Sequence, residues 1–253
     1  VAHPNVGPFL GRQLIQRLVT SNPSPDYISR VSAAFDDNGS GVRGDLGAVF
    51  RAILLDPEAR DTSRIDDPTF GKVREPIVRW VQLGRAFHAT SDSGQFRHFG
   101  GGAIEGEADH GELVPFGQYP YFAPSVFNFF LPTYQPNGPA GNAGLVAPEM
   151  EIVHSYTAIA TTNLFNRAIV EEFYITDTEE ADVWLDLQGE VDLAESDPVA
   201  LIDRLDLLLT YGTLSAATRQ IVLDAILPLD DALQQVFLAL YLVTISPEYA
   251  VQR

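Results

Sequence analysis

The chain has 253 residues, contains no cysteine and carries a formal net charge of −18 at pH 7. The lack of cysteine excludes disulfide scaffolds, thiolate metal sites and cysteine nucleophiles, and the strong negative charge excludes nucleic acid as a partner class. No apolar run approaches the ~20 residues that cross a bilayer, so we expect no membrane span.

The first sixty residues show helical periodicity. Apolar residues at three- and four-residue steps predict a first helix. Its expected buried face consists of Val6, Phe9, Leu10, Leu14 and Leu18. Ser24 followed by Pro25 predicts the N-cap and first turn of a second helix. Asp45 is expected to cap a third helix that ends before Pro57. The expected buried face of this third helix consists of Leu46, Val49, Phe50, Ile53 and Leu54.

A fourth helix is predicted over residues 75–89, with Trp80 and Phe87 inward. Residues 90–146 then break the pattern, because they are rich in Gly, Pro and aromatic residues. Only Ser125–Phe130 is a short helical candidate there. Irregular stretches of this length are usually functional or disordered.

Helical periodicity returns at Pro148 and is expected to run to about Tyr174. Further helices are predicted to open at Asp197, Ser215 and Asp230. No segment shows the sustained alternation of a strand. The expected fold class is therefore all-α: an irregular multi-helix bundle formed as a single domain over residues 1–253, with residues 90–146 as a long irregular insertion.

Negative charge is concentrated late in the chain. Residues 1–127 hold 12 Lys/Arg against 15 Asp/Glu, whereas residues 128–253 hold 4 against 19. Solubility explains such a surface; uptake of divalent cations or docking to a basic partner is the functional alternative.

Two predicted helices end in similar sequences, Asp56-Pro57-Glu58 and Ser246-Pro247-Glu248. The likeness indicates either an internal duplication of a helix and its Pro-Glu turn or a common signal that stops one helix and starts another.

A calcium loop is one candidate site. Asp36, Asn38 and Ser40 alternate oxygen ligands as the start of such a loop does, and Asp45 is a further candidate ligand. The twelfth position, which needs a bidentate carboxylate, is Gly47. A polar loop between helices is the alternative, and calcium is the one cofactor that the pattern suggests.

The glycine-rich stretch from Gly94 to Gly111 contains a second candidate. His98, Asp109 and His110 combine imidazole with carboxylate, which can bind a metal ion or act as a general base. Their spacing matches no metal motif, and a surface loop is the alternative.

An aromatic run forms the third candidate. Its candidate binding residues are Tyr119, Tyr121, Phe122 and Tyr134, which could stack on sugars or on another chain. The alternative is that Phe127, Phe129 and Phe130 fill the helical core.

Several segments together resemble a bacterial family, the domain of unknown function 1800. They are His3–Ile15, Gly44–Leu46 with its helix to Asp56-Pro57-Glu58, Val73–Pro76, Phe116–Gln118, Pro124–Phe130 and Thr244–Arg253. The resemblance implies a large exported bacterial protein of which this chain is the C-terminal portion, secreted, periplasmic or extracellular. It transfers no catalytic residues to this sequence.

The expected function is that of a non-enzymatic scaffold or binding component in an extracellular or cell-surface assembly, with other protein chains as partners through self-assembly or through an exported partner. A metal-assisted or carboxylate-based hydrolase acting on an extracellular polymer is the alternative. The common hydrolase, kinase and dehydrogenase motifs do not occur in the sequence.

Overall fold

The structure is a computed structural model that describes residues 2–92, 94, 116–118, 123–171 and 183–253. The chain divides into two compact units. Unit 1 comprises Val1–Val73, Phe130–Glu151 and Val251–Arg253, and unit 2 comprises Arg74–Phe129 and Ile152–Ala250. Helices dominate both, so the described parts of the chain are mostly α, as the sequence predicts.

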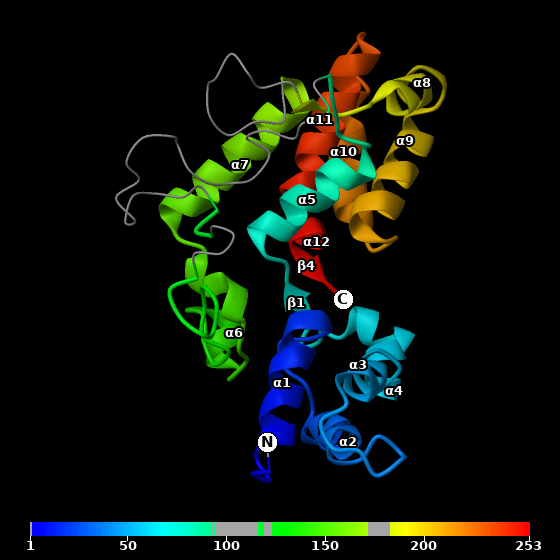
Figure 1. Cartoon of the computed structure of the whole chain (residues 1–253). Helices are drawn as coiled ribbons and strands as arrows, with labels where there is room; N and C mark the ends of the chain where they lie inside the picture. The colour runs from blue at the N-terminus through cyan, green and yellow to red at the C-terminus, as the bar shows by residue number, and fades with distance from the viewer. Residues whose placement is uncertain (1, 93, 95–115, 119–122, 172–182) are drawn as a thin grey trace. The chain divides into compact units, whose positions relative to one another are not determined.

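Unit 1 is built on three helices, labelled α1, α2 and α3 in Figure 1, which pack against one another. Its elements are α1 Val6–Leu18, α2 Pro25–Asp36, α3 Leu46–Leu54, α4 Pro57–Arg60, η1 Thr62–Asp66, β1 Lys72–Val73, α6 Pro139–Asn142 and β4 Val251–Gln252, with η2 Pro148–Ile152 at the boundary of the units. The two predicted caps are confirmed. The Ser24 hydroxyl accepts a hydrogen bond from the amide of Tyr27 at 3.1 Å, and the Asp45 carboxylate accepts one from the amide of Ala48 at 3.2 Å.

The predicted inward face of α1 is wrong in part. Phe9 and Leu18 are exposed, and the face that packs on α2 contains Gly7, Gly11 and Ile15. A Cβ at Gly7 would lie 2.6 Å from the Ser32 hydroxyl oxygen. Glycines four residues apart share a helix face, and here they let the two backbones approach more closely than leucine side chains permit.

A two-stranded antiparallel ladder joins distant parts of unit 1. Lys72 pairs with Gln252 and Val73 with Val251. Beside it the ammonium group of Lys72 lies 3.1 Å from the carboxylate of Glu149, and both side chains are buried. The last residues of the chain are therefore part of the same unit as α1.

Unit 2 contains the remaining elements. They are α5 Pro76–Ala86, β2 Thr90–Ser91, α7 Ser155–Val170, β3 Val183–Trp184, α8 Gln188–Ser196, α9 Pro198–Leu205, the π-helix η3 Asp206–Thr210, α10 Ala216–Ile226, α11 Ala232–Thr244 and α12 Pro247–Ala250. Helix α11 is central, since α7, α8 and α10 all pack against it. Strands β2 and β3 form a second short antiparallel pair.

The core of unit 2 is aromatic at one end. Trp80 and Phe87 are buried, as predicted, and the Trp80 ring lies 5.5 Å from that of Phe116 and 5.7 Å from that of Phe165. Tyr249 meets Phe165 edge-on at 6.0 Å. Tilted and edge-on pairs of this kind add stability beyond the area they bury.

Two predicted helices differ in the structure. Residues 125–130 form a turn, in which the amide of Asn128 donates to the carbonyl of Ser125 at 3.1 Å and Asn128 has φ 71°. The helix expected from Pro148 is interrupted, because His154 adopts an extended conformation between η2 and α7. None of the helices in the described ranges combines the length and apolar character needed to cross a bilayer.

Candidate functional site

The solvent-facing side of α3 is apolar. Leu46, Phe50 and Leu54 are 50%, 39% and 48% exposed, and Leu55 beyond the helix end is 59% exposed. Residues four apart line one face of a helix, so these side chains form a continuous stripe. The sequence predicts all five apolar residues of α3 to be inward, and the structure buries only Val49 and Ile53.

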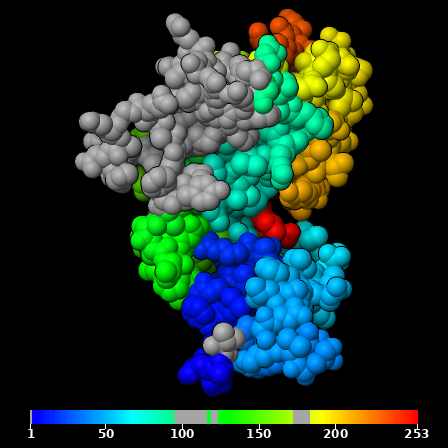
Figure 2. Space-filling model, viewed as in Figure 1, coloured from blue at the N-terminus to red at the C-terminus, as the bar shows by residue number. Residues whose placement is uncertain are grey.

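One charged residue lies on this helix. Arg51 is exposed, and no carboxylate in the described ranges pairs with it. A groove of about 800 Å³ lies between α2 and α3, and Arg51 and Leu55 line it, whereas Leu46, Phe50 and Leu54 do not. Asp37, Asp45 and Asp56 also line this groove. We call Leu46, Phe50, Arg51, Leu54 and Leu55 the α3 face. In Figure 2 the light-blue atoms of this part of the chain lie at the surface of unit 1.

Hydrogen bonds hold both ends of α3. At its start, Asn38 donates to the Asp45 carboxylate at 2.8 Å, and this bond, with the one from Ala48, lowers the pKa of Asp45. At its end, the buried Tyr27 hydroxyl donates to the carbonyl of Ile53 at 2.6 Å. Burial raises the pKa of Tyr27, so this hydroxyl keeps its proton. The α3 face is therefore presented by a rigid helix.

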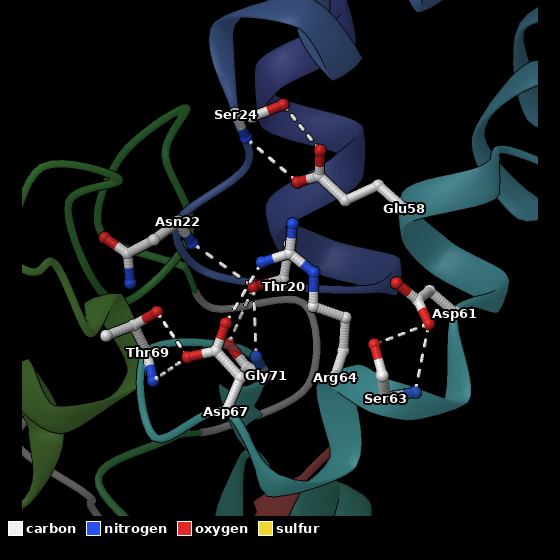
Figure 3. Close-up of polar contacts among 10 residues, drawn as sticks. All are labelled: Thr20, Asn22, Ser24, Glu58, Asp61, Ser63, Arg64, Asp67, Thr69 and Gly71. Atoms are coloured by element: carbon white, nitrogen blue, oxygen red, sulfur yellow. Dashed lines mark hydrogen bonds and ion pairs between the residues drawn. The ribbon is translucent and has the colours of Figure 1, made fainter.

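Ionic groups tie α2 to the turn that follows α3. Arg30 donates two hydrogen bonds to the Asp56 carboxylate, at 2.7 and 2.8 Å. Figure 3 shows Glu58, at the start of α4, directed at Ser24, whose amide and hydroxyl donate to its carboxylate at 3.0 and 2.5 Å. Bidentate pairs of this type fix orientation as well as distance.

The segment between α4 and β1 is shaped by short polar turns. Asp61 accepts from the amide and hydroxyl of Ser63, and Asp67 accepts from those of Thr69 (Figure 3). Such Asx turns satisfy backbone amides outside helices. Asp61 and Asp67 therefore have a structural role in this segment.

The calcium candidate residues lie between the end of α2 and the start of α3, and the structure gives Asp36, Asn38 and Asp45 protein partners. Asp36 pairs with Arg43, and the Asn38 side-chain oxygen accepts from the amide of Ser40 at 2.9 Å. Asp45 caps α3. In the parts of the chain that the structure describes, no three His, Asp or Glu side chains gather as metal ligands would. Calcium binding stays a prediction.

Most other candidates fall in undescribed parts of the chain. The hydrolase alternative depends on His98, Asp109 and His110, which lie outside the described residues. The same holds for the candidate binding residues Tyr119, Tyr121 and Phe122. Tyr134 is half-buried in unit 1. Phe130 is buried and lies under the Arg17 guanidinium at 4.3 Å, whereas Phe127 and Phe129 are half-buried.

Unit 2 contains a cleft of about 670 Å³ at the end of α5. Its polar side chains come from His88, Thr90, Glu171, Asp186 and Gln188. Its apolar lining comes from Trp184, Leu187, Val191, Leu233 and Phe237. His88 has φ 47°, an uncommon conformation for a residue with a side chain. The cleft combines one imidazole with carboxylates, and among the described residues no hydrogen bond or ion pair joins them.

A buried arginine brings together three of the segments noted in the sequence. The guanidinium of Arg74 donates to Gln82 and to the carbonyl oxygens of Leu209 and Tyr249, and lies 4.6 Å from the Tyr249 ring. The neighbouring Glu75 accepts from Gln118 at 2.5 Å. The acceptors of Arg74 are thus a side-chain amide and two backbone carbonyls. Backbone acceptors leave no signal in a sequence.

Comparison with known proteins gives one match. No curated protein and no solved structure matches the chain. A family model, described as a protein of unknown function (DUF1800), matches residues 1–251. The chain therefore belongs to the DUF1800 family.

Proposed function

We propose that this protein is a non-enzymatic binding component of an assembly outside the cytoplasm, and that the α3 face docks an acidic amphipathic helix of a partner protein. The observation that carries this proposal is the apolar stripe Leu46, Phe50 and Leu54 on the exposed side of a well-ordered helix.

The stripe supports binding because a surface helix ordinarily presents polar residues to water. Contiguous exposed apolar patches mark interaction sites. Fully burying a leucine or phenylalanine side chain is worth about 1.5–3 kcal/mol. The three side chains of the stripe together with Leu55, already partly covered, supply enough free energy to offset part of the cost of association.

The kind of partner follows from the counterpart helix in unit 2. Helix α11, like α3, begins after an aspartate N-cap and is followed by an X-Pro-Glu turn. The acidic helix α8 packs against it. Helix α8 contains Glu190, Asp192 and Glu195 and no Lys or Arg.

The positive charge of Arg51 also favours an acidic helix as the partner. Arg51 flanks the stripe on the side that lines the groove, and α3 carries no acidic residue. A negatively charged helix would place a carboxylate against Arg51 and its apolar face against Phe50. Electrostatic complementarity of this sort selects partners and orients them.

The location outside the cytoplasm rests on the family resemblance and the cysteine-free composition. Fractionation of the producing cells tests it: we expect the protein in the periplasm or the medium, and its recovery in the cytoplasm alone would contradict it.

Photo-crosslinking tests the docking surface. A benzoylphenylalanine placed at Phe50 in the producing organism is expected to form one dominant adduct with another protein. The matched control carries the same group at Ile221, which is 61% exposed on α10. The captured protein, once purified, is expected to bind the wild-type chain through an acidic helix, and Leu54→Glu is expected to weaken binding at least tenfold.

Three outcomes would overturn the proposal. They are the absence of an adduct at Phe50, the same set of adducts at Phe50 and Ile221, and an adduct formed only with a second copy of this chain. Binding of the purified partner that Leu54→Glu leaves unchanged would also overturn it.

A further inference from the structure

A second, smaller cavity lies inside unit 2, apart from the cleft at His88. It has a volume of about 170 Å³ and is bounded by α5, α7 and the C-terminal end of α11. Arg79 is the charged residue in its lining, and Phe165, Val153 and Ile245 supply apolar walls.

Arg79 has no counter-charge in the described ranges. Its Nε atom is buried and has no hydrogen-bond partner, and its guanidinium carbon lies 5.8 Å from the centre of the Phe165 ring. A buried cation without a paired anion is costly. Burial accordingly lowers the pKa of Arg79, and the charge of Arg74 lowers it further.

The lack of a carboxylate here is unusual for this part of the molecule. Unit 2 contains 7 Lys/Arg and 23 Asp/Glu. Two other arginines of this unit form ion pairs. Arg204 lies 2.6 Å from the carboxylate of Glu190, and Arg219 lies 2.5 Å from that of Asp203 and 3.2 Å from that of Asp206. Arg74, Arg79 and the exposed Arg85 have no such pair among the described residues, and Arg74 and Arg79 lie five positions apart.

The lining also restricts which anion fits. The hydroxyl of Thr157 donates to the carbonyl of Ile152 at 2.8 Å, and that of Thr162 donates to the carbonyl of Ala158 at 2.8 Å. The hydroxyl of Thr244 likewise donates to the carbonyl of Tyr241 at 2.9 Å. These three protons are thus used within the protein, and Arg79 is the charged donor in the lining. A guanidinium edge matches a planar carboxylate bidentately, whereas a phosphate would need more donors.

The volume of the cavity and its apolar walls indicate the size and chemistry of the rest of the ligand. The volume corresponds to about six water molecules at ~30 Å³ each, so the ligand has roughly six non-hydrogen atoms. The apolar walls favour a short branched hydrocarbon group. We propose that this cavity binds a small aliphatic monocarboxylate, held by Arg79 at its carboxylate and by Phe165, Val153 and Ile245 at its hydrocarbon end.

Isobutyrate, with six non-hydrogen atoms, is a suitable probe, and isobutyramide is its neutral isostere. Saturation-transfer NMR on the full chain is expected to show isobutyrate binding in the millimolar range, the affinity expected for a ligand this small. Isobutyramide is expected to bind at least tenfold more weakly. Trp80 contacts Phe165, so tryptophan fluorescence offers an independent signal.

Variants separate the site from nonspecific effects. Arg79→Gln is expected to weaken isobutyrate binding at least tenfold, and the matched control Arg85→Gln, on the exposed side of α5, is expected to leave it unchanged. If Arg79→Gln fails to fold, Ala158→Leu keeps the arginine and fills the cavity. Ala158 is itself exposed, and we expect this variant to fold and to lose binding.

The proposal is wrong if isobutyrate fails to bind at tens of millimolar, or if isobutyramide binds equally well. Tighter binding of inorganic phosphate than of isobutyrate would likewise exclude a carboxylate site. Retained binding in a folded Arg79→Gln or Ala158→Leu variant would place the ligand elsewhere.

Discussion

Glu58 accepts hydrogen bonds from both the amide and the hydroxyl of Ser24, 34 residues earlier in the chain. Unit 2 repeats this relationship: Glu248 accepts from the amide of Ser215 at 3.2 Å and from the hydroxyl of Thr218 at 2.8 Å. In both units the serine caps a helix, and the glutamate follows a proline after the next long helix. The two Pro-Glu turns thus share a structural role.

Removing this glutamate should destabilise unit 1. Glu58→Ala leaves the amide and hydroxyl of Ser24 without their charged acceptor, and the Glu58 side chain is only 10% exposed. We expect the free energy of unfolding to fall by about 2 kcal/mol, measured by urea unfolding followed by circular dichroism. The control, Glu195→Ala, changes an exposed glutamate of α8 and should cost less than about 0.5 kcal/mol. Equal losses in the two variants would contradict this role for Glu58.

The buried pair of Lys72 and Glu149 should show strong coupling. The two side chains are 7% and 1% exposed, so either Lys72→Met or Glu149→Leu alone breaks the ion pair and leaves one of its charges buried. Each single variant is expected to lose about 3–5 kcal/mol. The double variant should be more stable than either single variant, because both charges are then gone. Additive losses in the double-mutant cycle would mean that the two groups do not depend on each other.

Asp56 should make the stability of unit 1 depend on pH. Burial raises the pKa of Asp56, but hydrogen bonds from Arg30 and from the amide of Glu58 outweigh this effect, so the pKa lies below its ordinary value. A depressed folded-state pKa contributes stability above the unfolded-state value of about 3.9. That contribution is lost as the pH falls through the folded-state pKa.

The difference in the free energy of unfolding between wild type and Asp56→Asn should therefore be constant near neutral pH and shrink below about pH 4. Urea unfolding across this range measures it. The exposed Asp230→Asn control should show a difference that hardly changes with pH. A wild-type advantage over Asp56→Asn that grows with acidity would refute the assignment.

Gly71 should be irreplaceable because of the strand beside it. Its φ is 107°, and a Cβ there would lie 2.4 Å from the carbonyl oxygen of Gln252. Gly138 has a similar φ of 102° but open space around its Cβ position, so it is the matched control. Gly138→Ala is expected to cost about 1–3 kcal/mol from backbone strain alone. Gly71→Ala should cost clearly more and speed amide exchange in residues 72–73 and 251–252; equal costs would show that the steric contact is unimportant.

The sequence by itself determined the helices and their caps. Ser24, Asp45, Asp197 and Ser215 each accept from amides of the helix they precede, because capping depends on residues within one turn of each other. The position of Trp80 and Phe87 in a core also followed from local periodicity. Two neighbouring aspartates precede the last long helix, and both carry the same capping signal. The sequence predicts Asp230 as the N-cap, and the structure uses Asp231.

Only the tertiary structure decided which apolar face of each helix is buried and which groups meet across the chain. Periodicity cannot distinguish a leucine stripe that packs from one that faces water, so the exposure of Leu46, Phe50 and Leu54 depends on where α1 and α2 lie against α3. The partners of Arg74 are carbonyl groups 135 and 175 residues away, and every residue has a carbonyl. Long-range pairing and burial are properties of the packed chain, and for that reason the α3 face and the Arg79 cavity become visible only in the fold.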